Sequence, residues 1–84
     1  MLVKQIKSLL YDNININHLE IQDETYKHAN HKQSNGGHFK IVIISNDFRD
    51  VSLINRHKMI YNALSTLIGK EIHAISISAR TVDE

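Results

Sequence analysis

Histidine is the side chain in this sequence most suited to holding a metal. The segment YKHANHKQSNGGHF, residues 26–39, contains His28, His31 and His38, and His73 stands near the start of a later apolar segment. The chain has no cysteine, so it has no disulfide, no thiolate-only metal site and no cysteine nucleophile of its own. The segment is therefore a metal site, a solvated loop, or half of a site that another protein completes.

Length and charge limit the function classes. The 84 residues have room for one small domain, which we expect to span residues 1–84. A net charge of +1 contributes little of the attraction on which nonspecific nucleic-acid binding depends. The first residues lack an uninterrupted apolar core, and the run IVII is too short to cross a bilayer. We therefore expect a cytoplasmic protein with no membrane partner.

The first half of the chain predicts a helix and two strands. Apolar residues from Leu2 to Leu10 recur at the spacing of one helical face. From about His18, LEIQDET alternates as in a half-buried strand. After a polar stretch, HFKIVIIS is the strongest strand pattern in the chain, and we expect it to be central. The residues expected on one face of this strand are Phe39, Ile41 and Ile43.

The second half predicts a long helix and a third strand. Ser52 is a suitable N-cap, and we expect Gly69 to end the helix. Its apolar stripe is expected to contain Leu53, Ile60, Leu64, Leu67 and Ile68. The segment IHAISISA then alternates as a strand, which places His73 and Ile72 on opposite faces. The face of His73 is expected to carry Ile75, Ile77 and Ala79 as well.

The order of these elements predicts a fold class. The first two strands are close enough in sequence to pair antiparallel, and a right-handed crossover through the long helix makes the third strand parallel to the second. Both helices then need the same face of the sheet for their apolar stripes. We expect a two-layer α+β domain in the order helix-strand-strand-helix-strand, with a three-stranded mixed sheet.

Four ordered blocks resemble the BolA family and span nearly the whole chain. They are DETYKH, GGHFKIVIIS, NRHKMIYNAL and IHAISISA. The resemblance implies a type II KH-like fold, in agreement with the element order. It also implies a partnership with a monothiol glutaredoxin around a shared [2Fe–2S] cluster, in iron–sulfur and iron homeostasis. The alternative implied by some bacterial members is a DNA-binding transcriptional regulator.

The resemblance also implies a set of ligands. A monothiol glutaredoxin brings two thiolates, its own cysteine and that of bound glutathione, so two ligands must come from this chain. Histidine replaces cysteine on one iron in Rieske centres. The family's invariant ligand matches His73, and the loop ligand of its histidine subgroup matches His28, for which His31 could substitute. We expect the isolated chain to hold no stable cluster and to be a monomer or weak homodimer.

Less specific interpretations apply to the same residues. Without the resemblance, His73 would more often be a histidine at the edge of the core, and His31 a solvated loop residue. His38 and His57 occupy positions where the family usually has histidine, and neither is the first choice as a ligand. Arg56, His57 and Lys58 first suggest a charged helix face, and contact with nucleic acid second.

Some features of the sequence argue against nucleic-acid binding and against catalysis. The GxxG loop of KH domains is absent, because the turn before the long helix reads NDFRD. Asp47 and Asp50 would repel a phosphate there, and Asp50 stands where many family members have glycine. No P-loop or GxSxG motif occurs, so we expect no enzymatic activity. A zinc ion held by His28, His31 and His73 alone is a weak alternative to the shared cluster.

Overall fold

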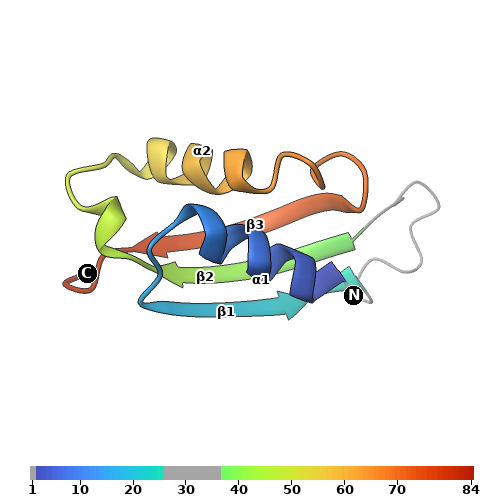
Figure 1. Ribbon diagram of the computed structural model, residues 1–84, viewed down its shortest axis with the longest axis horizontal. Coiled ribbons are helices and arrows are strands. Elements are labelled where there is room, and N and C mark those ends of the chain that lie inside the picture. The colour runs from blue at the N-terminus through green and yellow to red at the C-terminus, as the bar shows by residue number, and fades with distance from the viewer. Residues whose placement is uncertain (1, 26–36) are drawn as a thin grey trace.

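The computed structural model describes residues 2–25 and 37–84, and it has the predicted order of elements (Figure 1). The elements are α1 (Leu2–Asn13), β1 (His18–Asp23), β2 (Gly37–Ile44), the 3-10 helix η2 (Asn46–Phe48), α2 (Leu53–Ala63) and β3 (Ile72–Arg80). No helix in these two ranges is long and apolar enough to cross a bilayer.

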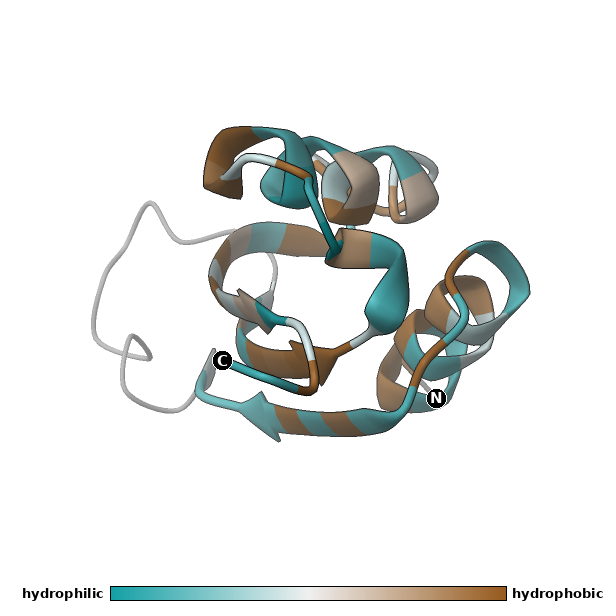
Figure 2. Cartoon of the chain, turned by 90° about the vertical axis from the view of Figure 1, so that its left-hand side faces the viewer, coloured by the Kyte–Doolittle hydropathy of each residue, from teal (hydrophilic) through white to brown (hydrophobic). Residues whose placement is uncertain are grey.

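The sheet has the strand order β1-β2-β3, so β2 is central as predicted. β1 pairs antiparallel with β2, and β3 pairs parallel with β2. Both helices lie on one face of this sheet, and α2 forms the crossover between the two parallel strands (Figures 1 and 2). The two-layer α+β prediction is confirmed.

The core lies between the sheet and the helices. Phe39, Ile41 and Ile43 of β2 are buried on the face predicted for them. They join Ile6 and Leu10 of α1 in one cluster. The other buried members of this cluster are Ile14, Phe48, Ile60, Leu64, Leu67, Ile72 and Ala79. Burial of these side chains on one face of each element is what fixes the two layers against each other.

The predictions for the long helix need two corrections, one to its C-terminal end and one to its apolar stripe. α2 begins after Ser52, whose hydroxyl accepts a hydrogen bond from the Asn55 N–H at 3.3 Å, as expected for an N-cap. The helix ends at Ala63, however, and the chain continues in turns through Gly69, which adopts a positive φ of 80° three residues before the start of β3. Leu53 is 66% exposed, because the first turn of α2 extends beyond the buried stripe.

The start of β3 departs from the predicted alternation. Gly37 of β2 pairs with Ile72, but His38 pairs with Ala74, so one additional residue, His73, is inserted in β3. This β-bulge shifts the faces by one position. Ile72 is consequently buried in the core, and His73 is exposed. The prediction that His73 shares the face of the core isoleucines is therefore wrong. It assumed regular alternation along the strand, which does not predict a bulge.

Candidate functional site

The candidate site lies at the end of the sheet where β1 ends and where β2 and β3 begin (Figure 1). His38 of β2 and His73 of β3 meet there, with ring centroids 5.2 Å apart and ring planes inclined by 46°. His38 is half-buried, whereas His73 is exposed. An imidazole that is exposed and also held against a second ring can bind a metal or a partner without unfolding any element.

Gly37 makes the bulge at His73 possible. Its N–H donates to the Glu71 carbonyl at 2.7 Å, which connects the start of β2 to the residue before β3. A Cβ at position 37 would overlap the ring of Phe39 and press on the Glu71 carbonyl. A glycine is therefore required at this position for the two strands to begin side by side.

The two residues that precede segment 26–36 form hydrogen bonds with the backbone of His38. The Glu24 N–H donates to the His38 carbonyl at 2.7 Å, and the His38 N–H donates to Thr25 Oγ1 at 3.1 Å. The Thr25 N–H donates to Asp23 Oδ1 at 2.9 Å. Hydrogen bonds from Thr25, through its side chain and its backbone, lower the pKa of Asp23 below its usual value. The chain therefore leaves β1 and enters β2 beside the two imidazoles.

A shallow pocket of about 220 Å³ borders this end of the sheet. Its lining residues are Glu24, His38, Phe39, Ala74, Ile75 and Ser76. Pockets that enclose small-molecule substrates are commonly about 300–1,000 Å³. This hollow is thus small for a substrate, and its position beside His38 fits a surface that another molecule covers.

The loop ligands of the sequence analysis, His28 and His31, lie outside the described residues. Within residues 2–25 and 37–84, no three His, Cys, Asp or Glu side chains gather closely enough to hold a metal ion. His73 is therefore the single predicted ligand whose surroundings are described, and its neighbour His38 was not expected to contact it.

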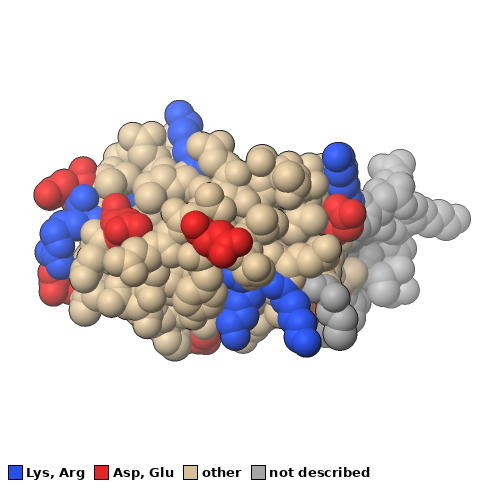
Figure 3. Space-filling model, in the orientation of Figure 1, with Lys and Arg blue, Asp and Glu red and all other residues tan. Residues whose placement is uncertain are grey.

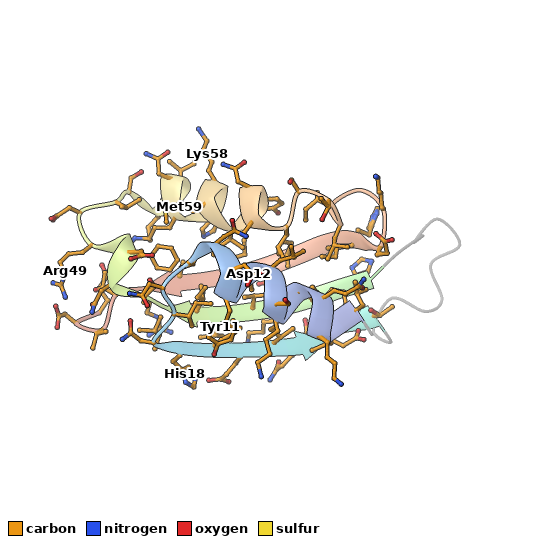
Figure 4. All side chains as sticks on the ribbon, viewed as in Figure 1. Tyr11, Asp12, His18, Arg49, Lys58 and Met59 are labelled. Atoms are coloured by element: carbon orange, nitrogen blue, oxygen red, sulfur yellow. The ribbon has the colours of Figure 1, made fainter. Side chains whose placement is uncertain are left out.

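The three residues predicted to contact nucleic acid have different surroundings. Lys58 is exposed and points away from the sheet on the outer side of α2, and His57 is half-buried (Figure 4). The side chain of Arg56 is only 7% exposed. Its guanidinium donates to the carbonyls of Val51 and Ala79 at 2.9 and 3.1 Å, and to both carboxylate oxygens of Glu84 at 2.6 and 3.1 Å. Arg56 therefore has its donors engaged within the protein.

The Arg56–Glu84 pair connects α2 to the segment that follows β3. Hydrogen bonds from the Arg56 guanidinium, and next from the Thr81 N–H, lower the pKa of Glu84 to about 2. The Arg56 side chain also passes over Phe48, with the guanidinium carbon 5.9 Å from the ring centroid. A signal for this burial was present in the sequence, because Arg56 is four residues before Ile60 and so belongs to the buried stripe.

Comparison with known proteins identifies the family. The model of the BolA-like protein family matches residues 10–84. The chain belongs to the BolA family. A BolA-like protein from Dictyostelium discoideum is 40% identical over 78 residues, which cover 92% of this chain and 68% of the relative. The BolA domain of SufE1 from Arabidopsis thaliana superposes with a TM-score of 0.84 at 34% identity, covering 95% of this chain and 91% of that one.

One further BolA relative has a function in its name. The DNA-binding transcriptional regulator BolA from Escherichia coli is 36% identical over 66 residues, and the match covers 79% of this chain and 62% of the regulator. This chain thus spans less than two thirds of the regulator's length.

The turn between β2 and α2 of this BolA chain carries acidic residues at the opposite end of the sheet. Asp47 accepts a hydrogen bond from the Asn15 N–H at 2.9 Å, and Asp50 adopts a positive φ of 61°. Glycine adopts a positive φ more readily than any residue with a side chain. Acidic and basic side chains alternate around this end and do not form a basic patch on the face in Figure 3.

Proposed function

We propose that this BolA-family protein partners a monothiol glutaredoxin and supplies two imidazole ligands to a [2Fe–2S] cluster shared between them, in iron–sulfur and iron homeostasis. The observation that carries the proposal is the exposed His73 in its bulge, at the end of the sheet where β1 ends and β2 begins. The protein acts as a binding partner and not as an enzyme.

The donor set of the chain fits half of such a cluster. A neutral imidazole is a known ligand of one iron in [2Fe–2S] centres, and the glutaredoxin cysteine and glutathione supply the two thiolates. His73 provides one imidazole. We assign the other to His28, because the resemblance to the BolA family matches His28 to the loop ligand of its histidine subgroup. His31 is the substitute ligand. The bound cluster supplies one-electron chemistry or iron and sulfide for transfer.

Mixing the protein with a cluster-loaded monothiol glutaredoxin tests the proposal. We expect visible absorption and circular dichroism that differ from those of the glutaredoxin alone, because imidazoles replace thiolates on one iron. His28→Ala should weaken or alter these bands, and the His28/His31 double substitution to Ala should abolish them. His18→Ala is the matched control, because His18 is an exposed histidine at the start of β1, the opposite end of the sheet (Figure 4). An unchanged glutaredoxin spectrum would refute the partnership.

A second function is supported by the relative named as a DNA-binding regulator. Lys58 and His57 are the accessible part of the predicted surface on α2, since Arg56 is engaged by Glu84. With so few phosphate contacts, affinity for DNA should be weak and should fall only modestly with salt. A fluorescence titration with duplex DNA at low salt, comparing the wild type with Lys58→Ala, tests it. Binding that Lys58→Ala does not reduce would exclude this surface.

A further inference from the structure

We propose that His38 is a positioning residue that orients the His73 imidazole as a cluster ligand and fixes Glu24 and Thr25 beside it. The inference rests on the proposed function, because it assigns a role within the same site. It concerns a side chain that was not a first choice as a ligand. Three separate contacts of the described residues carry it.

The first contact is between the rings. The His38 and His73 ring centroids lie 5.2 Å apart, a separation at which aromatic rings are in contact, and the ring planes are inclined by 46°. His73 is exposed and occupies the inserted position of a bulge. The half-buried His38 ring therefore provides a wall that limits the orientations of the His73 imidazole.

The other two contacts are made by the His38 backbone. Its carbonyl accepts from the Glu24 N–H at 2.7 Å, and its N–H donates to Thr25 Oγ1 at 3.1 Å. These bonds fix the two residues that immediately precede segment 26–36. His38 thus contacts His73 through its ring, and Glu24 and Thr25 through its backbone.

The ring contact and the backbone contacts can be separated by substitution. His38→Ala removes the ring and keeps the backbone bonds, whereas His38→Phe keeps an aromatic ring and removes both ring nitrogens. Lys40→Ala is the matched control, because Lys40 is the next residue of β2 on the same face of the sheet and is exposed. Thermal melting and amide spectra of all three variants verify that the fold is retained.

The first measurement uses the protein alone. Three-bond couplings to Cγ of His73, measured by NMR, report whether its χ1 angle has one value or several. We expect one rotamer in the wild type, Lys40→Ala and His38→Phe, and averaging over several rotamers in His38→Ala. A single His73 rotamer in His38→Ala would overturn the proposal. This readout decides the role of His38 even if no glutaredoxin complex forms.

The second measurement uses the complex with cluster-loaded glutaredoxin. Loss of residues that orient metal ligands typically costs about 10- to 100-fold in affinity, and we expect this loss for His38→Ala and near wild-type behaviour for His38→Phe. Wild-type cluster binding by His38→Ala would overturn the proposal. Equal loss in both His38 variants, with the His73 rotamer intact in His38→Phe, would also overturn it, because His38 would then be a ligand itself. Absence of a cluster in the wild type would instead refute the proposed function.

Discussion

The two ends of the sheet are built differently. At the end where β2 leads into η2, polar groups are bonded to one another: Ser45 is fully buried, donates to the Asn15 carbonyl at 2.6 Å and accepts from the Asp47 N–H at 3.0 Å. Arg56 and Glu84 complete this end. At the opposite end, His73 is exposed, and its described neighbour is the ring of His38.

This difference separates stability from function within one small domain. Buried polar groups that keep all their partners hold a fold in one arrangement, and losing a single partner is costly. An exposed imidazole contributes little to stability, so it is available for a ligand. We therefore expect substitutions of the buried groups at the η2 end to destabilise the fold. Substitutions of the exposed His73 should leave the protein folded but unable to hold the shared cluster.

The largest effect on stability is expected for Phe48→Ala. Phe48 is fully buried at the end of η2, beneath the Arg56 guanidinium. Truncation of a buried phenylalanine costs about 3–5 kcal/mol in the free energy of unfolding. Urea denaturation measures it, with Leu53→Ala as the control, because Leu53 is 66% exposed and should change stability by less than about 0.5 kcal/mol. Equal effects of the two substitutions would contradict the account of the η2 end.

An intermediate effect, dependent on pH, is expected for Glu84→Gln. The pKa of Glu84 falls from 4.5 to about 2 in the folded protein, because the ionised carboxylate accepts hydrogen bonds from Arg56 and Thr81. The stabilisation is therefore fully present above about pH 4.5 and is lost as pH falls toward 2. The difference in unfolding free energy between the wild type and Glu84→Gln should shrink over that window.

A contrast within the same region sharpens this expectation. Asp83 pairs with Arg49 at 2.7 Å, but both side chains are more than half exposed. Exposed pairs contribute about 0–1 kcal/mol. Asp83→Asn should therefore destabilise the protein less than Glu84→Gln at neutral pH, and the reverse order would be evidence against the role assigned to Arg56.

A small effect of backbone conformation is expected at Asp50. Its φ of 61° costs a side-chain-bearing residue energy that glycine does not incur. Left-handed backbone costs an ordinary residue about 1–2 kcal/mol, so Asp50→Gly should be more stable than Asp50→Ala by about 1 kcal/mol. Thermal melting of the pair measures this. A more stable alanine variant would show that this turn does not need a positive φ.

Much of the fold was predictable from the sequence, because regular elements repeat their apolar residues at fixed spacing. The alternation of Phe39, Ile41 and Ile43 correctly indicated the buried face of the central strand. The helix order and the strand directions followed from chain connectivity and were confirmed.

The features that were missed arise where the regular spacing fails or where a charged residue is buried. The bulge depends on the close approach of Gly37 to Glu71, a tertiary contact that no local pattern contains. Arg56 was interpreted as part of a charged surface because arginine is rarely buried without a partner, and that partner, Glu84, is distant in sequence. The contact between His38 and His73 follows from the bulge, so it was equally hidden.

The most direct test of the central claim compares His73→Ala with the wild type in two measurements on the same samples. Thermal melting of the protein alone should show little change, because His73 is exposed. Visible circular dichroism after mixing with a cluster-loaded monothiol glutaredoxin should show that the bands of the shared cluster are lost. A His73→Ala variant that retains the wild-type dichroism would contradict the assignment of His73 as a ligand, and one that fails to fold would contradict the separation of stability from function.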